Sequence, residues 1–435
     1  MNLIAHKTAR LAGDISIPGS KSHTIRGVVM ASLANGTSRL KNPLDSADTL
    51  AAFNAAQSFG ARIDTSHPGE WIIEGFGSHP QKLPGGPIDM LNSGTSTNLF
   101  ASVAALGDFE IIIDGDASIR RRPVQPLLDA LLQLGAEAQS IGKNGCPPLR
   151  IKGPLRGGEA EVDCRSSQYV SSLLITCPLI HPGQTTTIRV RNVCEVPYIQ
   201  MTLDWLKSLG IQVEQKGYEC FRIPGGQSYQ PFVREIPADW SSATFPLCAA
   251  AMIEGSDCLI KGLDIQDSQA DRQVLEHLQK MGAGIEVTDQ GIRVCGQGLH
   301  GTELDLNNTP DALPAIAATA CMAEGVTVIG NVAHARIKET DRIQVMAQEL
   351  GRMGAKIKET PDGLIIEKSS LHGSTVEGHH DHRVVMALSL AAMAASGHTS
   401  ITTAEAVNVT FPTYVSLMQG LGACLEMTDG KPRPV

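Results

Sequence analysis

Seven consecutive residues, 336–342, combine charges of both signs at a density that suggests chemistry. They read Arg-Ile-Lys-Glu-Thr-Asp-Arg, so five of the seven side chains are charged. An apolar helical pattern with Ile343, Met346 and Leu350 follows, which predicts that the run forms the first turn of a helix. Backbone N–H groups point outward there and attract anions. The run is therefore a candidate site for binding an anion and moving a proton, although many charge runs are only solvated helix starts.

Other predicted helix starts also carry polar and charged side chains. N-capping accounts for Ser, Thr, Asp and Asn at such places, and it explains Asp45, Asp48, Ser241 and Ser242. Capping does not require Lys or Arg, because a cation opposes the helix dipole at the N-terminus. Six cations remain at these starts: Lys21, Arg26, Arg122, Lys338, Arg342 and Arg383. Bound anionic ligands explain them better, with helix N-termini converging on a cleft between domains.

A repeat positions these loops along the chain. A glycine that follows an amphipathic run and precedes a short strand recurs about every 70 residues. The six glycines are Gly60, Gly135, Gly210, Gly282, Gly354 and Gly422. Glycine is the expected residue just past a helix C-terminus, so each marks a helix end. Each copy is predicted to run strand–helix–strand–helix–strand, with or without one more strand, which is an α/β arrangement.

Six copies in 435 residues indicate two domains of three copies each, since the chain is too long for one ordinary core. The junction is expected in the proline-marked stretch 230–237. The first strand, 13–17, ends at Pro18-Gly19, where the chain is expected to cross between domains. The predicted domains are residues 19–235, and residues 1–18 together with 236–435.

Composition narrows the class of protein. The chain has 42% apolar residues, 4% aromatic residues and 43 glycines, which is typical of a soluble α/β protein. A formal net charge of −9 argues against a general nucleic-acid binder. No apolar run approaches the roughly 20 residues of a membrane span, and the N-terminus lacks a signal-peptide core. Ten cysteines without C-x-x-C spacing favour reduced thiols in a cytoplasmic protein.

Two other motif interpretations are weaker. Gly19-Ser-Lys-Ser22 matches the end of a nucleotide-binding P-loop, but the upstream glycine pattern is absent. The cluster His379-His-Asp-His382 has the residue types of a zinc site. No other copy of the repeat supplies ligands of that kind, so no metal is expected.

The loops resemble those of the 3-phosphoshikimate 1-carboxyvinyltransferase (EPSP synthase) family of enolpyruvyl transferases. The matching motifs run in order along the chain: Pro18-Gly-Ser-Lys-Ser22, Asn92-Ser-Gly-Thr95, Arg122-Pro123, Ser166-Ser-Gln168, Pro310-Asp311, Lys338-Glu-Thr-Asp-Arg342 and Asp381-His-Arg383. The resemblance implies a two-domain inside-out α/β barrel of six βαβαββ-type repeats, three per domain. It places the active site in the interdomain cleft.

The activity that the resemblance implies is enolpyruvyl transfer in the shikimate pathway to chorismate and aromatic amino acids. The enolpyruvyl group of phosphoenolpyruvate passes to the 5-hydroxyl of shikimate 3-phosphate through a tetrahedral intermediate, and phosphate leaves. No metal or organic cofactor is implied, and a monomer is expected. Adding an alcohol to the double bond requires a base at the hydroxyl and an acid at the methylene carbon.

The resemblance also implies residue roles. Asp311, helped by Lys338, would be the base and Glu339 the acid, with Lys21 as a further catalytic residue. Shikimate 3-phosphate would be held by Lys21, Ser22, Arg26, Thr95, Ser166, Ser167, Gln168, Tyr198, Asp311, His334 and Lys338. Phosphoenolpyruvate would be held by Lys21, Gly94, Arg122, Gln168, Arg342 and Arg383. Bidentate arginines suit its carboxylate and phosphate.

Four positions depart from the family pattern. Asn98 replaces an Arg, Glu195 replaces a Ser, His334 replaces an Asn, and Asn408-Val409 stands where a Lys is usual. Two alternatives therefore stay open, an enolpyruvyl transferase with a different acceptor and a non-catalytic anion-binding paralogue. The relative that acts on UDP-N-acetylglucosamine is disfavoured, because the stretch 115–123 lacks its reactive Cys.

Overall fold

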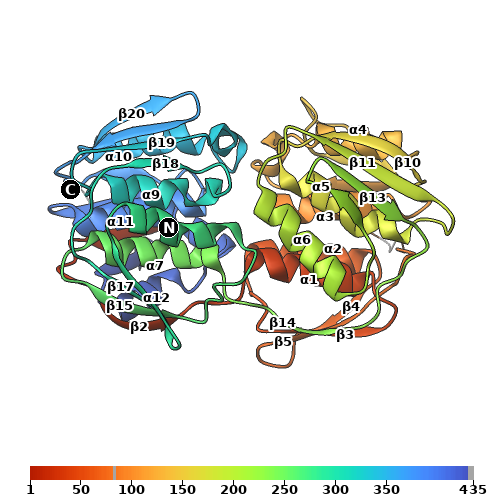
Figure 1. Cartoon of the computed structure of the whole chain (residues 1–435), viewed down its shortest axis with the longest axis horizontal. Helices are drawn as coiled ribbons and strands as arrows, with labels where there is room; N and C mark the ends of the chain where they lie inside the picture. The colour runs from red at the N-terminus through yellow and green to blue at the C-terminus, as the bar shows by residue number, and fades with distance from the viewer. Residues whose placement is uncertain (82–84, 430–435) are drawn as a thin grey trace. The chain divides into compact units, whose positions relative to one another are not determined.

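Six four-stranded sheets, each with two α-helices, make up the regular structure in the described part of this computed structural model (Figure 1). The structure describes residues 1–81 and 85–429. Contacts divide the chain into unit 1, which comprises Met1–Pro18 and Ala238–Val435, and unit 2, which comprises Gly19–Pro237. The division after Pro237 lies two residues beyond the limit expected from the sequence.

All six sheets share one strand order, which reflects one repeated chain path. One example is the sheet of β10 (Gly158–Asp163), β11 (Thr185–Arg191), β13 (Cys220–Pro224) and β12 (Glu214–Lys216), in that order. In it β10 is parallel to β11, whereas β13 is antiparallel to both β11 and β12. The parallel pair requires a crossover, which a helix supplies, and the antiparallel pair needs only a short hairpin. Each copy is therefore β-α-β-α-β-β. The predicted six-copy α/β arrangement is confirmed, and the optional fourth strand is present.

Unit 2 contains three copies, and their elements follow in chain order. The first copy comprises α1 (Lys21–Ser32), β3 (Thr37–Lys41), α2 (Ala47–Ser58), β4 (Arg62–Asp64) and β5 (Glu70–Glu74), with β14 (Val233–Glu235) as its first strand. The second comprises β6 (Ile88–Asp89), α3 (Gly94–Ala104), β7 (Ile111–Asp114), η1 (Ile119–Arg121), α4 (Gln125–Gln133), β8 (Glu137–Ser140) and β9 (Leu149–Lys152). The third comprises β10 (Gly158–Asp163), α5 (Ser167–Thr176), η2 (Cys177–Leu179), β11 (Thr185–Arg191), α6 (Val196–Ser208), β12 (Glu214–Lys216) and β13 (Cys220–Pro224).

Unit 1 contains the other three copies. The fourth comprises β2 (Ala12–Ser16), α7 (Trp240–Met252), β15 (Asp257–Lys261), η3 (Ala270–Gln273), α8 (Val274–Lys280), β16 (Gly284–Thr288) and β17 (Gly291–Cys295). The fifth comprises β18 (Glu303–Asp305), η4 (Pro310–Ala312), α9 (Leu313–Ala320), β19 (Val326–Gly330), η5 (Ala333–Ile337), α10 (Arg342–Arg352), β20 (Lys356–Thr360) and β21 (Gly363–Glu367). The sixth comprises β22 (Thr375–Glu377), α11 (His382–Ala394), β23 (His398–Thr402), η6 (Ala404–Val409), α12 (Tyr414–Gly420), β24 (Leu425–Thr428) and β1 (Asn2–His6).

The predicted glycine caps are found at all six helix ends. Gly60, Gly135, Gly210, Gly282, Gly354 and Gly422 have φ values between 75° and 105°. Only glycine adopts this backbone conformation at little cost, so a side chain there would strain the turn that sends the chain into the next strand.

The first helix of each copy lies in the interior of its unit. Every residue of α9 is buried, and α9 packs against α7 and α11. In unit 2, α3 packs against α1 and α5. A helix that is apolar on all sides belongs in a core, so polar side chains concentrate at the helix starts, where the candidate site residues lie.

The strands of residues 1–18 complete two sheets of unit 1. Strand β1 lies between β23 and β24 and is antiparallel to both, while β2 is parallel to β15. The side chain of Leu3, on β1, is completely buried. The predicted strand 13–17 is thus found one residue earlier, at 12–16.

Shortening a buried side chain of β1 should lower the stability of unit 1. We expect Leu3→Ala to lower the free energy of unfolding by about 2–5 kcal/mol, because the change leaves a cavity among packed side chains. The control Leu132→Ala removes a side chain that is 49% exposed and should change it by less than about 0.5 kcal/mol. Chemical denaturation of both variants tests this, and equal losses would contradict the role of β1.

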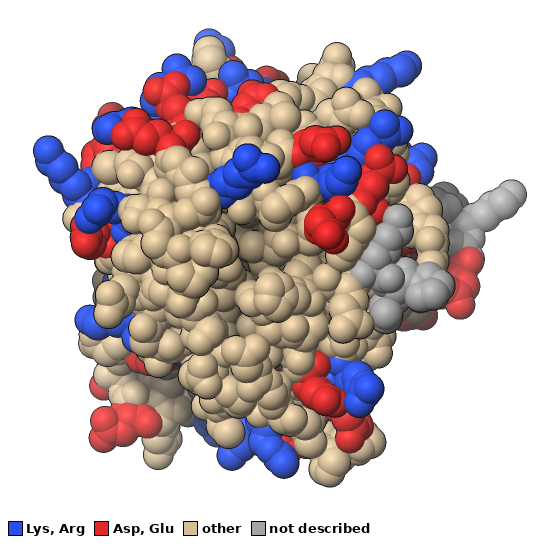
Figure 2. All heavy atoms as spheres, turned by 90° about the vertical axis from the view of Figure 1, so that its right-hand side faces the viewer, with Lys and Arg blue, Asp and Glu red and all other residues tan. Residues whose placement is uncertain are grey.

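Figure 2 shows one face of the molecule, on which acidic and basic side chains lie close to one another around a broad area without charged residues. Exposed cross-strand ion pairs include Arg191–Glu161 and Arg222–Glu214, and such pairs contribute about 0.2–1 kcal/mol each. Within residues 1–81 and 85–429, none of the ten cysteines is joined in a disulfide. In the described residues, none of the helices has the length and apolar character needed to cross a membrane.

Candidate active site

The charge run 336–342 is divided among three parts of the fold. Arg336 belongs to η5, residues 338–340 form a loop, and α10 begins at Arg342. Asp341 is the N-cap, and its carboxylate accepts a hydrogen bond from the Gln344 backbone N–H at 3.0 Å. The prediction that the whole run forms the first helical turn is therefore wrong, because Asp341 caps the helix and excludes the preceding residues from it.

Arg342 forms hydrogen-bonded ion pairs with three acidic residues of this region. Its guanidinium donates from Nη1 to Asp311 (2.7 Å), from Nη2 to Glu339 (2.6 Å) and from Nε to Asp381 (2.8 Å). The side chain is 1% exposed. Burial disfavours the guanidinium charge, but the three carboxylates outweigh this effect and hold the pKa of Arg342 well above its usual value. Two of the predicted catalytic residues, Asp311 and Glu339, are thus held by one buried cation.

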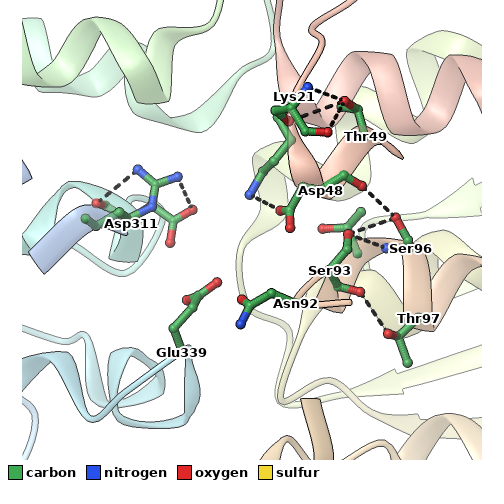
Figure 3. A network of polar contacts seen from close by, with 12 residues as sticks. Lys21, Asp48, Thr49, Asn92, Ser93, Ser96, Thr97, Asp311 and Glu339 are labelled. Carbon is green, nitrogen blue, oxygen red and sulfur yellow. Dashed lines mark hydrogen bonds and ion pairs between the residues drawn. The ribbon is translucent and has the colours of Figure 1, made fainter. Parts of the chain in front are cut away.

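Asp311 lies in η4, at the start of the inner helix α9, and bridges two arginines. Its second oxygen, Oδ2, is 3.0 Å from Nη2 of Arg383, the second residue of α11. Burial alone would raise the pKa of Asp311, but the charges of Arg383, Arg342 and Lys338 outweigh it and hold that pKa far below the usual range. The carboxylate shown in Figure 3 is therefore ionised at neutral pH.

Asp271 is a buried acid that the sequence prediction missed. It lies in η3, and its carboxylate accepts a hydrogen bond from the Ser241 hydroxyl. Burial and the charge of Asp311 raise the pKa of Asp271 to about 6, against the opposing charge of Arg383. A signal existed, because Asp271 opens the second helical segment of its copy, where other copies carry predicted site residues.

Capping was assigned to the wrong residues in two copies. Asp239 caps α7 by accepting from the Ser241 N–H at 2.9 Å, so neither Ser241 nor Ser242 is the cap. Ser46 is the N-cap residue of α2, which makes the capping prediction for Asp45 and Asp48 wrong as well. Several cap-type residues stand within three positions at each start, and only the backbone path selects one.

In unit 2, Asp48 pairs with a predicted catalytic residue. Lys21 is the first residue of α1, and its Nζ lies 3.0 Å from Oδ2 of Asp48 in the first turn of α2 (Figure 3). Both side chains are largely buried, at 14% and 5% exposure. The carboxylate offsets the cation that would otherwise oppose the dipole of α1.

Gly94 leaves room for the side chain of Arg122, a residue predicted to bind phosphoenolpyruvate. A Cβ added at Gly94, the first residue of α3, would lie 2.8 Å from Nη1 of Arg122. Arg122 is positioned by hydrogen bonds from Nη2 to Asn92 Oδ1 and to Ser118 Oγ, both 3.0 Å. A side chain at position 94 would therefore displace the Arg122 guanidinium from this position.

Gln168 connects the starts of α3 and α5. Its amide donates to Thr95 Oγ1 (3.1 Å) and accepts from Asn98 Nδ2 (2.7 Å). Asn98, which departs from the family pattern, thus orients a residue predicted to contact both substrates.

The serines at the start of α5 face an acid. Ser166 is the N-cap, and the next residue, Ser167, donates to Glu195 Oε2 from its backbone N–H (3.1 Å) and its hydroxyl (2.8 Å). Glu195 is 2% exposed.

Arg26 is buried and holds two other predicted residues by their backbone. It donates to the carbonyls of Ser22 and Tyr198, both at 3.2 Å, and to Thr202 Oγ1 at 2.9 Å. Burial lowers the pKa of Arg26 to about 10, against the charges of Tyr198 and Glu195, so it remains cationic at neutral pH.

The predicted residues are divided between the two units. Unit 1 carries Asp311, His334, Lys338, Glu339, Arg342 and Arg383, and unit 2 carries Lys21, Ser22, Arg26, Gly94, Thr95, Arg122, Ser166, Ser167, Gln168 and Tyr198. His334 lies in η5, and Lys338 is the first residue after the end of η5. Val409, which stands where the family usually has a Lys, is the last residue of η6.

The histidine cluster 379–382 is split among separate partners. His379 Nε2 lies 3.0 Å from Glu349 Oε1, while Asp381 binds Arg342. In the part of the chain that the structure describes, no group of three or more His, Cys, Asp or Glu side chains is placed to hold a metal ion.

Comparison with known proteins identifies the family of this chain. The family model for EPSP synthase (3-phosphoshikimate 1-carboxyvinyltransferase) matches residues 5–418. The 3-phosphoshikimate 1-carboxyvinyltransferases of Acetivibrio thermocellus and Ruminiclostridium cellulolyticum are 47% and 45% identical, over 97% and 96% of this chain and 98% of each relative. A solved structure of EPSP synthase from Acinetobacter baumannii superposes with a TM-score of 0.82 at 30% identity, covering 99% of this chain and all of that chain. The chain belongs to the EPSP synthase (3-phosphoshikimate 1-carboxyvinyltransferase) family.

Proposed function

We propose that this chain is a 3-phosphoshikimate 1-carboxyvinyltransferase. It transfers the enolpyruvyl group of phosphoenolpyruvate to the 5-hydroxyl of shikimate 3-phosphate, releases phosphate, and needs no metal or organic cofactor. The observation that carries the proposal is the buried Arg342, which binds the carboxylates of both Asp311, in η4, and Glu339, in the loop before α10. Family membership along almost the whole chain supports the same activity.

The cations are proposed to bind phosphoenolpyruvate. Arg383 and Arg342 in unit 1, and Lys21 and Arg122 in unit 2, supply positive charge for its phosphate and carboxylate. Each of the four is engaged by acidic or polar side chains of the protein. The substrate anions would replace some of these partners, and we propose that the ligands draw residues from both units.

Asp311 is proposed to be the base that takes the acceptor's hydroxyl proton. In the free protein its pKa is held low by Arg383, Arg342 and Lys338, and a carboxylate of low pKa is a weak base. The negative charges of bound phosphoenolpyruvate would offset these cations. The basicity of Asp311 would then rise only after the substrate binds, which links proton transfer to a filled site.

Glu339 is proposed to be the acid at the methylene carbon. The hydroxyl oxygen forms a bond to carbon 2 of phosphoenolpyruvate, its proton passes to Asp311, and the methylene carbon receives a proton from Glu339. Loss of that proton and of phosphate from the tetrahedral intermediate then restores the double bond in the product. Lys338, whose charge acts on Asp311, would orient the acceptor hydroxyl.

Phosphate release from phosphoenolpyruvate tests the proposal. We expect turnover with shikimate 3-phosphate and none when the acceptor is left out. Turnover with another hydroxylated acceptor alone would contradict the proposal and establish an altered specificity. If no acceptor supports phosphate release, the remaining hypothesis is a non-catalytic anion-binding paralogue.

We further propose that the protein acts as a monomer in the cytoplasm. The resemblance supports a monomer, and the free thiols suit a reducing compartment. Light scattering should give a mass near the 46.2 kDa of one chain, and twice that mass would exclude the monomer.

A further inference from the structure

The carboxylate of Glu195 is hydrogen-bonded to the start of α5. Ser167 presents a backbone N–H and a hydroxyl, and Glu195 Oε2 accepts from both, at 3.1 and 2.8 Å. A phosphate group of a ligand would use these same donors, because the first turn of a helix offers its N–H groups to anions. The carboxylate of Glu195 therefore occupies the place where the phosphate of a ligand would bind.

The carboxylate is held there by its surroundings. Glu195 is the N-cap residue of α6 and has left-handed backbone angles (φ 48°, ψ 42°), which Asn, Asp and His adopt more readily than Glu. Its side chain is 98% buried, and the positive charge of Arg26 acts on it. A buried carboxylate needs such donors and a nearby cation to remain charged.

We propose that Glu195 determines acceptor specificity by competing, as an internal carboxylate, with the phosphate of the acceptor for the two donors of Ser167. This inference rests on the proposed function for the identity of the acceptor. When the phosphate binds, the Glu195 side chain must leave Ser167, so every acceptor binds at the expense of these two hydrogen bonds. Acceptors whose anion cannot displace the carboxylate are rejected.

Glu195→Gln is the variant of choice, because Gln keeps the size of the side chain and removes its charge. We expect the KM for shikimate 3-phosphate to fall roughly 10-fold or more, as a charged competitor becomes a neutral one. The KM for phosphoenolpyruvate should stay the same, and kcat should change by less than about twofold. If Glu195 served only to hold Ser167 in place, the KM of the acceptor would instead be unchanged or rise.

A matched control separates this local effect from a change of net charge. Glu161→Gln removes the same charge in the same repeat from an exposed side chain paired with Arg191. It should leave the KM of the acceptor unchanged. In a Ser167→Ala background, where one shared donor is missing, Glu195→Gln should give a smaller gain, and an equal gain would overturn competition through Ser167.

Calorimetric titration with shikimate 3-phosphate measures binding directly, so it tests the inference independently of turnover. Tighter binding by Glu195→Gln than by the parent protein supports the inference even if neither turns over, in which case only the proposed function fails. Turnover by the parent protein, with equal or weaker binding by Glu195→Gln, overturns the inference and leaves the function standing. Binding by neither protein overturns both.

Discussion

Replacing Asp311 with Asn should lower kcat by roughly 10²- to 10⁴-fold while phosphoenolpyruvate still binds. Asn keeps the shape of the side chain but cannot take the proton of the acceptor hydroxyl. Arg342 keeps two carboxylate partners, Glu339 and Asp381, so the local structure should persist. Steady-state kinetics and calorimetry with phosphoenolpyruvate measure the two effects separately.

Asp271→Asn is an informative control for this result. Asp271 is a buried acid close enough for the charge of Asp311 to raise its pKa, yet it has no proposed role in proton transfer. We expect its replacement to reduce kcat far less than Asp311→Asn does. Near-normal turnover by Asp311→Asn would remove Asp311 from the role of base, and an equal loss in both variants would show that the effect is not specific to it.

Replacing Arg342 with Met should destabilise unit 1 by about 3–5 kcal/mol at neutral pH. Three carboxylates would lose their shared cation inside the protein. The matched control is Arg293→Met, which breaks an exposed two-bond pair with Asp257 (2.7 and 2.6 Å) and should cost far less stability, because water screens exposed ion pairs. Urea denaturation gives both values, and similar losses would contradict the central role of Arg342.

The pH dependence of stability should be weaker in Arg342→Met than in the parent protein. In the parent, the pKa of Asp311 is lower when folded than when unfolded, so its contribution is complete above about pH 4 and is lost as pH falls below that value. In Arg342→Met, Arg383 and Lys338 still act on Asp311 but one of its three cations is gone, so the pKa of Asp311 in the folded state should be lowered less. The variant then loses less stability as pH falls below about 4, and its deficit relative to the parent protein should shrink there.

The sequence predicted what depends on local pattern. Six glycines after amphipathic runs are sufficient to count the repeats, because a helix end with positive φ favours glycine regardless of its surroundings. The same pattern located the helix starts that carry Lys21, Asp311 and Arg383. The roles assigned to those residues came from the resemblance to a known family, and they stay predictions.

The partners of these residues could not be predicted, because most of them lie on other helices or loops, many positions away in the sequence. Arg342 meets Asp381 across 39 positions, and Lys21 meets Asp48 from the neighbouring helix. Asp48 was mistaken for a cap, since capping statistics consider one helix at a time and cannot include a cation from another. Glu195 was noted only as a departure from the family, and its two bonds to Ser167 required the packed structure.

The position of β1 and β2 in unit 1 has a consequence during synthesis on the ribosome. These strands are made before any of unit 2, but the partners of β1 are β23 and β24, near residues 398–402 and 425–428. At roughly 5–20 residues per second, β1 waits on the order of 20–80 s for β24. Its apolar edge is open to wrong pairing throughout that time, while unit 2 already has all its own strands. A chaperone that binds short apolar segments on nascent chains would therefore assist the folding of unit 1 more than that of unit 2.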